Sequence, residues 1–137
     1  MDYDQLKIRD FKHWGLFLHA NQYPYVGRCY AWAHREHAST VTSMRIAEQE
    51  ELFGLVLPEW NRTIRELYTH DWPNVACFGN TSPHLHWHFI PRYHSPRLVH
   101  GITFIDPNPR GNYAPYERKK LDLEVLLKIK EDIQAKL

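Results

Sequence analysis

The chain has 137 residues, a formal net charge of +1 at pH 7, and 43% hydrophobic and 14% aromatic residues. This length suits one domain with a buried core, and the composition is globular rather than disordered. The near-zero charge argues against bulk binding to nucleic acid or a membrane surface, and no apolar run approaches transmembrane length. The charged N-terminus also lacks the apolar segment of a signal peptide. We therefore expect a single domain over residues 1–137.

The first third of the chain predicts two strands joined by a long turn. Residues 11–20 and 28–34 carry aromatic and aliphatic side chains with partial alternation, and Pro24 and Gly27 punctuate the stretch between them. An antiparallel hairpin is the expected arrangement. A polar loop that contains His37 follows at residues 35–42.

A long amphipathic helix is predicted from residue 43 up to the breaking sequence Asp71-Trp72-Pro73. Apolar residues recur there at steps of three and four, which is the helical period. They are Leu52, Phe53, Leu55, Val56, Trp60, Ile64, Leu67 and Tyr68. Thr42 or Ser43 is the expected N-cap. Pro58 should kink or divide the helix, because proline cannot donate a backbone hydrogen bond.

The second half predicts two neighbouring strands, at residues 74–78 and 84–90, around a five-residue turn. A short edge strand is expected at 101–105, and a terminal amphipathic helix at about 117–136. The prolines and glycine between these two elements argue against regular structure there. Together the elements predict an α+β fold with a mostly antiparallel sheet of about five strands, one long helix and a C-terminal helix.

Three histidines alternate with large apolar residues in the stretch His84-Leu85-His86-Trp87-His88-Phe89-Ile90. Such alternation indicates a half-buried strand with all three imidazoles on one face. A zinc site, a histidine-rich solvent face and a catalytic row with one imidazole as nucleophile all fit this pattern. Among the functional interpretations the zinc site ranks last, because no carboxylate or cysteine lies nearby at a ligand spacing.

With the preceding turn Gly79-Asn80-Thr81-Ser82-Pro83, this stretch resembles the signature of the histidine triad superfamily, His-x-His-x-His followed by two apolar residues. The ending HLHWHFIPRY resembles the branch that is similar to bacterial diadenosine-polyphosphate hydrolases. Asn21-Gln22-Tyr23-Pro24-Tyr25 is similar to the turn before the family's second strand, and His37 matches a basic loop histidine after that strand. The resemblance covers roughly residues 11–93, and the C-terminal extension bears no motif.

The resemblance implies a role for each matched residue. His86 matches the nucleophile that attacks the α-phosphorus and forms a nucleotidyl-histidine intermediate. His84 and His88 match imidazoles that support the phosphate charge and orient the site. Asn21 is expected to contact the ribose. The other matched residues are expected to bind the nucleotide or its phosphates: His37, Asn74, Asn80 and Thr81.

The resemblance also implies a hydrolase that cleaves at the α-phosphorus of a dinucleoside polyphosphate or a nucleoside phosphoramidate. Because the nucleotidyltransferase branch carries glutamine at the third histidine, His88 favours hydrolysis over transfer. The alternative is a nucleotide-binding module with little turnover. A histidine nucleophile requires no cofactor, although a divalent metal is expected to be able to accompany a polyphosphate substrate. The family further implies a homodimer.

Other residues near the matched motifs have competing interpretations. Arg92 is expected at the surface, with a phosphate contact as the alternative. Tyr25, Trp32 and Phe17 are expected in the core, with stacking on a base as the alternative, and Trp87 faces away from the imidazoles. The two cysteines, Cys29 and Cys77, lie in apolar runs far from any CxxC spacing, so they are expected to be buried thiols in a reducing cytoplasm.

Overall fold

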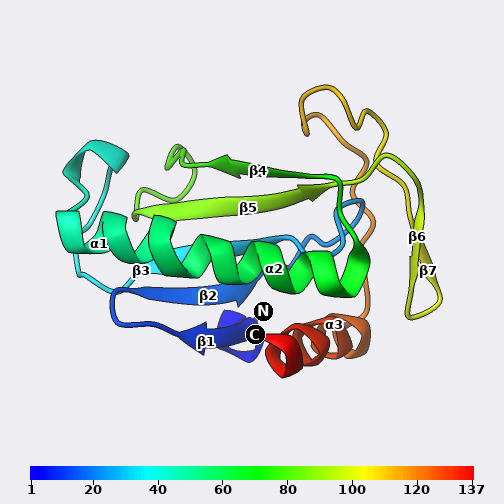
Figure 1. Cartoon of the computed structure of the whole chain (residues 1–137), viewed down its shortest axis with the longest axis horizontal. Helices are drawn as coiled ribbons and strands as arrows, with labels where there is room; N and C mark the ends of the chain where they lie inside the picture. The colour runs from blue at the N-terminus through cyan, green and yellow to red at the C-terminus, as the bar shows by residue number, and fades with distance from the viewer.

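The computed structural model describes all of residues 1–137 and has the predicted α+β architecture (Figure 1). Its main sheet has five antiparallel strands in the order β1-β2-β3-β5-β4. The strands are β1 (Lys7–Asp10), β2 (Trp14–Leu18), β3 (Cys29–Ala33), β4 (Trp72–Ala76) and β5 (His86–Arg92). The predicted class and the expected strand number are both confirmed.

The strand bounds differ from the prediction in an informative way. β1 lies before the expected first strand, and the hairpin of β2 and β3 is confirmed. β4 begins two residues before the predicted range 74–78, and β5 begins two residues after the start of the predicted range 84–90. β4 can include Pro73, which lies opposite Pro91, because an edge strand does not need every backbone donor. β5 starts late because the Leu85 N–H donates to the Ala38 carbonyl, so only one bond, from the Ala33 N–H to the Leu85 carbonyl, still joins this residue to β3.

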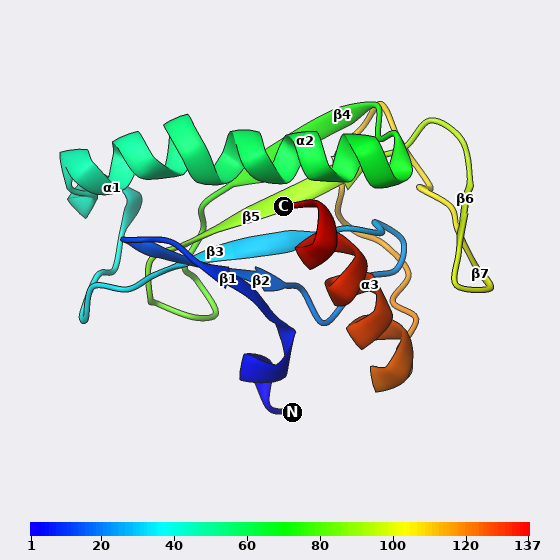
Figure 2. The same ribbon diagram turned by 60° about the horizontal axis from the view of Figure 1, so that its bottom comes forward.

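One long helical stretch lies along one face of the sheet (Figures 1 and 2). It consists of α1 (Ile46–Glu51), a π-helical turn (Leu52–Val56) and α2 (Leu57–Tyr68). Pro58 does not divide it, contrary to the prediction, because the proline stands in the first turn of α2 just after the wider π-helical turn. A π-bulge is a common way for a helix to absorb such a local mismatch.

The start of this helix also differs from the prediction. The N-cap is Arg45, and its backbone N–H donates to the Glu48 carboxylate at 2.8 Å. Thr42 and Ser43, the predicted caps, instead belong to a separate 3₁₀ turn (Val41–Ser43). Ser43 is committed to that turn, because its hydroxyl donates to the Thr40 carbonyl at 2.8 Å.

The core fills the space between the long helix and the facing side of the sheet. Trp60 is fully buried, with its ring centroid 5.2 Å from that of Phe89 on β5. Its indole Nε1 donates to the Gly27 carbonyl at 3.1 Å. Gly27 has φ +93°, and a Cβ there would lie 2.9 Å from the side chain of Ile64. Close packing of helix on turn therefore requires glycine at this position.

The last third of the chain leaves the main sheet. β6 (Arg97–Val99) and β7 (Ile102–Phe104) form their own hairpin, so the predicted edge strand at 101–105 does not join the main sheet. Residues 105–122, here called the C-terminal arm, have no regular secondary structure. α3 (Leu123–Lys136) begins six residues later than predicted, with Asp122 at its N-cap, and contacts β1 and α2 (Figure 2).

Two smaller features complete the description. A 3₁₀ turn (Tyr3–Leu6) precedes β1. None of the helices combines the length and the apolar character needed to cross a membrane.

Candidate active site

β5 presents two of the three alternating imidazoles on the sheet face opposite the long helix. The ring centroids of His86 and His88 are 4.9 Å apart, in a T-shaped arrangement. Directly opposite them on β3 stand Trp32 and Tyr30, which share their face of the sheet. On β2, Phe17 pairs with Tyr30 and stacks on its ring at 5.2 Å. A pair of imidazoles is thus flanked on one side by aromatic rings.

His86 is held in a single orientation by a main-chain group. Its Nδ1 lies 2.6 Å from the carbonyl oxygen of His84. A carbonyl oxygen only accepts, so Nδ1 must carry the hydrogen of this bond. In the neutral imidazole, Nε2 then keeps its lone pair, which is the form that a histidine nucleophile requires.

The ring of His84 lies outside the shared imidazole site. Its Nε2 donates to the Ala33 carbonyl at 2.7 Å, and the ring stacks on Trp32 with centroids 4.3 Å apart. His84 precedes β5, so its side chain does not continue the row of His86 and His88. The main-chain carbonyl of His84 therefore orients His86, while its imidazole packs beside the site rather than within it.

His88 is kept in its neutral form. Burial, followed by the charges of Arg28 and His86, lowers the pKa of His88 to about 4. Its Nδ1 is buried and has no hydrogen-bond partner. At neutral pH His88 is therefore an uncharged imidazole with an unused polar atom.

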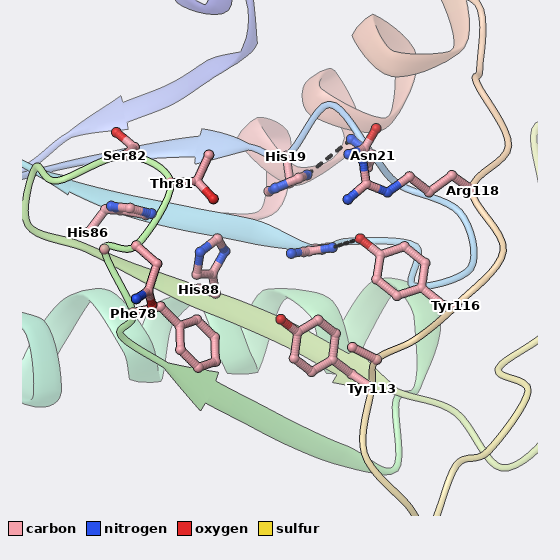
Figure 3. Close-up of a pocket in the computed structure, with 14 residues that line it drawn as sticks. His19, Asn21, Phe78, Thr81, Ser82, His86, His88, Tyr113, Tyr116 and Arg118 are labelled. Carbon is pink, nitrogen blue, oxygen red and sulfur yellow. Dashed lines mark hydrogen bonds between the residues drawn. The ribbon is translucent and has the colours of Figure 1, made fainter.

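A further imidazole, His19, lies beside His88 with ring centroids 5.9 Å apart. The backbone N–H of Asn21 donates to His19 Nδ1 at 3.0 Å (Figure 3), so the ring hydrogen of neutral His19 is on Nε2. Burial, followed by the charge of Arg28, lowers the pKa of His19 to about 2. The sequence reasoning missed His19. A polar residue directly after an apolar strand and two positions before Asn21 was the signal that could have found it.

Two cavities meet at these imidazoles. Six of the lining residues are common to both cavities: His19, Asn21, Thr81, Ser82, His86 and His88. One cavity, of about 460 Å³, lies toward the C-terminal arm and is here called the arginine cavity because Arg28 and Arg118 line it. The other, of about 600 Å³, is here called the aromatic cavity because Phe17, Tyr30 and Trp32 line it. His86 thus stands where a polar and an aromatic space join.

No protein-family model and no curated protein matches the chain. Several solved structures, in contrast, have a similar fold. A histidine triad protein from Sinorhizobium meliloti aligns with a TM-score of 0.74 and 16% identity, covering 96% of this chain and 89% of its own. One from Bradyrhizobium japonicum aligns at 0.72 and 19% identity, covering 95% and 88%. One from Marinobacter aquaeolei aligns at 0.71 and 19% identity, covering 98% and 93%. The fold is that of the histidine triad proteins.

Within this histidine triad fold, three of the predicted binding residues lie at the imidazoles. Asn21 and Thr81 line both cavities, and Asn80 lines the arginine cavity (Figure 3 labels Asn21 and Thr81). They approach from two loops, the turn after β2 and the turn before β5. The structure therefore brings these side chains together with His86 and His88.

Two predicted binding residues do not reach the imidazoles. His37 is exposed on the loop after β3 and lines neither cavity. Its φ of 61° places its backbone in the left-handed region. Asn74 shares the sheet face of His88 but stands farther along, where its side-chain oxygen accepts from Arg92 at 2.9 Å. It lines a separate hollow.

Two arginines have roles that the sequence did not reveal. Arg28 is only 4% exposed, lines the arginine cavity, and donates from Nη1 to the Tyr116 hydroxyl at 2.7 Å. Arg92, expected at the surface, is 2% exposed. It forms a two-bond ion pair with Asp106, at 2.8 and 3.0 Å. Arg92 thus ties the C-terminal arm to β5 rather than binding a phosphate.

The aromatic residues with open interpretations divide between core and cavity. Tyr25 is buried and bonds to the arm, and Trp87 packs on Phe53 at 5.4 Å, so both are structural. Phe17 and Trp32 line the aromatic cavity instead. Cys29 is fully buried as predicted, whereas Cys77 is only partly buried. No three His, Cys, Asp or Glu side chains are arranged to hold a metal ion.

Proposed function

We propose that this protein is a nucleotide hydrolase that cleaves at the α-phosphorus of a dinucleoside polyphosphate or a nucleoside phosphoramidate. One observation carries the proposal. The His84 carbonyl fixes the Nδ1–H of His86 at 2.6 Å and so directs the Nε2 lone pair to the site where two cavities meet. A nucleophile held in one tautomer beside a ligand-sized space is the arrangement that covalent catalysis needs.

The two cavities suggest how a nucleotide would lie. The aromatic cavity offers the faces of Phe17, Tyr30 and Trp32, on which a base can stack with about 1–3 kcal/mol per base. Asn21 stands at the junction, where a ribose would follow the base. The α-phosphate would then reach His86, one ribose beyond the base.

The reaction has two steps, each balanced within the site. In the first, the lone pair of His86 Nε2 attacks the α-phosphorus, and the bond from phosphorus to the leaving group breaks with its electron pair. In the second, water attacks the phosphorus of the nucleotidyl-histidine, the phosphorus–nitrogen bond breaks, and His86 recovers its lone pair. A phosphate leaving group departs in the first step as an anion, whereas an amine leaving group takes up a proton from solvent in that step. The proton that the water releases in the second step passes to solvent, and a nucleoside monophosphate departs.

The charge on the transferring phosphoryl group is met by hydrogen-bond donors that line the cavities. Thr81 supplies a hydroxyl, Asn80 an amide, and neutral His19 the N–H on Nε2. His88 stays uncharged, with its pKa lowered to about 4, so it can donate one ring hydrogen without forming a competing ion pair. The positive charge comes from Arg28.

The accompanying assignments follow the same proposal. The nucleophile needs no cofactor, and any divalent cation enters together with a polyphosphate substrate. A reducing cytoplasm suits two free thiols, Cys29 and Cys77.

A homodimer is proposed from the resemblance. Apolar side chains left exposed along the long helix and the β4 edge suit such an interface. They include Ile46, Phe53, Leu55 and Trp72. Light scattering on the protein as it elutes from a sizing column measures the molar mass and so tests the dimer.

The proposal is tested by incubating the protein with diadenosine tetraphosphate and with adenosine 5′-phosphoramidate and measuring AMP release. His86→Asn should abolish turnover, and intact mass should show one nucleotidyl group on the wild-type enzyme during turnover. His94→Asn, at an exposed loop position, is the matched control. Full turnover by His86→Asn would refute the mechanism. Tight nucleotide binding by calorimetry without product would support the alternative, a binding module.

A further inference from the structure

The arginine cavity carries more positive charge than one α-phosphate needs. Arg28 and Arg118 both line it, and no aspartate or glutamate does. Neither guanidinium lies within ion-pair distance of a carboxylate. The imidazoles of His19 and His88 add no charge at neutral pH. Two arginine charges therefore face this space without an internal counter-ion.

Of the two arginines, Arg28 gives the stronger indication that an anion binds in the cavity. It is only 4% exposed, and its Nε is buried without any hydrogen-bond partner. Burying a guanidinium is costly unless its charge and its N–H groups are satisfied. Its one side-chain hydrogen bond goes to the neutral Tyr116 hydroxyl, at 2.7 Å, and its guanidinium also lies over the rings of Tyr113 and Tyr116, 5.6 and 5.8 Å from their centroids. None of these partners carries a negative charge. An anion in the cavity would supply the missing opposite charge.

The C-terminal arm is held so that it completes this space. Arg92 ties the start of the arm through Asp106, and the Tyr25 hydroxyl donates to the Tyr113 carbonyl. Figure 3 shows Tyr113 and Tyr116 projecting from the arm toward the site, and Arg118 extending toward Asn21. The arm is therefore a wall of the cavity rather than a loose extension.

The position of the cavity defines what the anion is. The aromatic cavity and the arginine cavity meet at His86 and His88, so they adjoin the reacting phosphorus from two directions. A base in the aromatic cavity leaves the arginine cavity for the group on the other side of the scissile bond. Its volume of about 460 Å³ is within the range of small-ligand sites and exceeds the need of a single departing ammonia.

We propose that the arginine cavity is a subsite for a leaving group that carries phosphates, with Arg28 as its buried cation and Arg118 as a second cation supplied by the C-terminal arm. This inference rests on the proposed function and narrows its substrate class. Phosphoanhydrides, whose leaving group is an anionic phosphate chain, are preferred over phosphoramidates, because guanidinium groups bind phosphate oxygens with paired, charge-assisted hydrogen bonds.

The kinetic test compares two substrates that share the adenosine and the α-phosphate. Diadenosine tetraphosphate has a polyphosphate leaving group, and adenosine 5′-phosphoramidate has ammonia. Arg118→Gln should lower kcat/KM for diadenosine tetraphosphate about tenfold relative to kcat/KM for adenosine 5′-phosphoramidate, as expected for losing a charged hydrogen bond. Arg110→Gln is the matched control, because this exposed arginine belongs to the same arm but lines a different hollow. An unchanged ratio in Arg118→Gln would overturn the inference.

A binding test separates this inference from the proposed function. Calorimetry with inorganic tripolyphosphate should show binding to the wild type and to Arg110→Gln, and about tenfold weaker binding to Arg118→Gln, at low salt. Absence of tripolyphosphate binding by the wild type would overturn the subsite even if AMP is released. Tripolyphosphate binding without AMP release from either substrate would overturn the hydrolase proposal alone. Circular dichroism confirms that the exposed Arg118 was replaced without loss of folding.

Discussion

β5 and the C-terminal arm both contribute to the same cavity, but they position their side chains in different ways. β5 is a central strand, hydrogen-bonded to β3 and β4 on its two sides, so the direction of His86 and His88 follows from the pleat. The arm has no ladder of its own. Its Tyr113, Tyr116 and Arg118 reach the cavity only because side chains of the core hold the arm by individual bonds.

This difference separates robust from vulnerable parts of the site. The imidazoles are fixed by many backbone bonds, so no single side chain decides their position. The arm is fixed by a few, and Arg92 makes most of them, donating to Asp106 and to the carbonyls of Asn108 and Gly111. Substitutions at such anchors should therefore affect the arginine cavity more than the nucleophile.

The largest effect is expected for Arg92→Ala. The variant leaves Asp106, whose side chain is fully buried, without its ion-pair partner. Breaking a buried pair from one side costs about 3–5 kcal/mol of unfolding free energy. Urea denaturation measures this loss, and tripolyphosphate binding should weaken more than AMP binding because the arm loses its anchor.

The same residue pair supplies a milder variant. Asp106→Asn keeps the shape and acceptor oxygen, so its cost should be smaller than that of Arg92→Ala. Arg110→Ala, on the exposed part of the arm, should change stability by less than about 0.5 kcal/mol. Equal losses in Arg92→Ala and Arg110→Ala would show that Arg92 is not the anchor.

The next effect is a dependence of stability on pH that arises at the imidazoles. Folding lowers the pKa of His88 to about 4 and that of His19 to about 2, from an ordinary value near 6.5. Below pH 6.5 these histidines bind protons in the unfolded chain but not in the folded chain. The free energy of unfolding therefore falls as the pH drops from about 6.5 toward 4. The slope per group is at most about 1.4 kcal/mol per pH unit, and smaller where solvent reaches the ring.

Urea denaturation at pH 7, 6 and 5 measures this slope. Burial also lowers the pKa of His70 to about 4, so this group contributes to the same slope. His88→Gln removes one of the three groups and should give a shallower dependence than the wild type. A parallel dependence in the variant would show that His88 is not held neutral by the fold.

A smaller effect is expected for His84→Gln. The bond that orients His86 comes from the main-chain carbonyl of residue 84, which the substitution leaves in place. What is lost is the stacking on Trp32, and the glutamine amide can still donate to the Ala33 carbonyl. We expect kcat to fall no more than about tenfold, against complete loss in His86→Asn. A loss as large as that of His86→Asn would mean that the His84 ring itself touches the phosphate.

The sequence was informative where structure follows from a local pattern. Alternation along β5 predicted the shared face of His86 and His88, and helical spacing predicted the long helix that backs the sheet. It did not place the His84 ring correctly, because the Leu85 N–H donates to the Ala38 carbonyl rather than to β3 and the ladder ends there. Alternation alone does not reveal where a strand begins.

Contacts between distant segments were beyond the sequence. Arg28 and Tyr116 are 88 positions apart, and Arg92 and Asp106 lie on either side of a separate hairpin. Nothing in the composition of residues 105–122 marks them as a cavity wall. A buried arginine can be distinguished from a surface one only when its partners are known, which is why Arg92 was misjudged.

The smallest effect is expected at His37, where the resemblance and the structure disagree. The resemblance gave this residue a place at the nucleotide, but it is exposed and lines neither cavity. His37→Asn is the suitable variant, because asparagine tolerates the left-handed backbone with φ 61° that alanine would strain. We expect kcat/KM for diadenosine tetraphosphate to stay within about twofold of the wild type and stability within about 0.5 kcal/mol. A clear loss of kcat/KM with unchanged stability would place His37 at the bound nucleotide, and the loop after β3 would then have to move toward the imidazoles when the substrate binds.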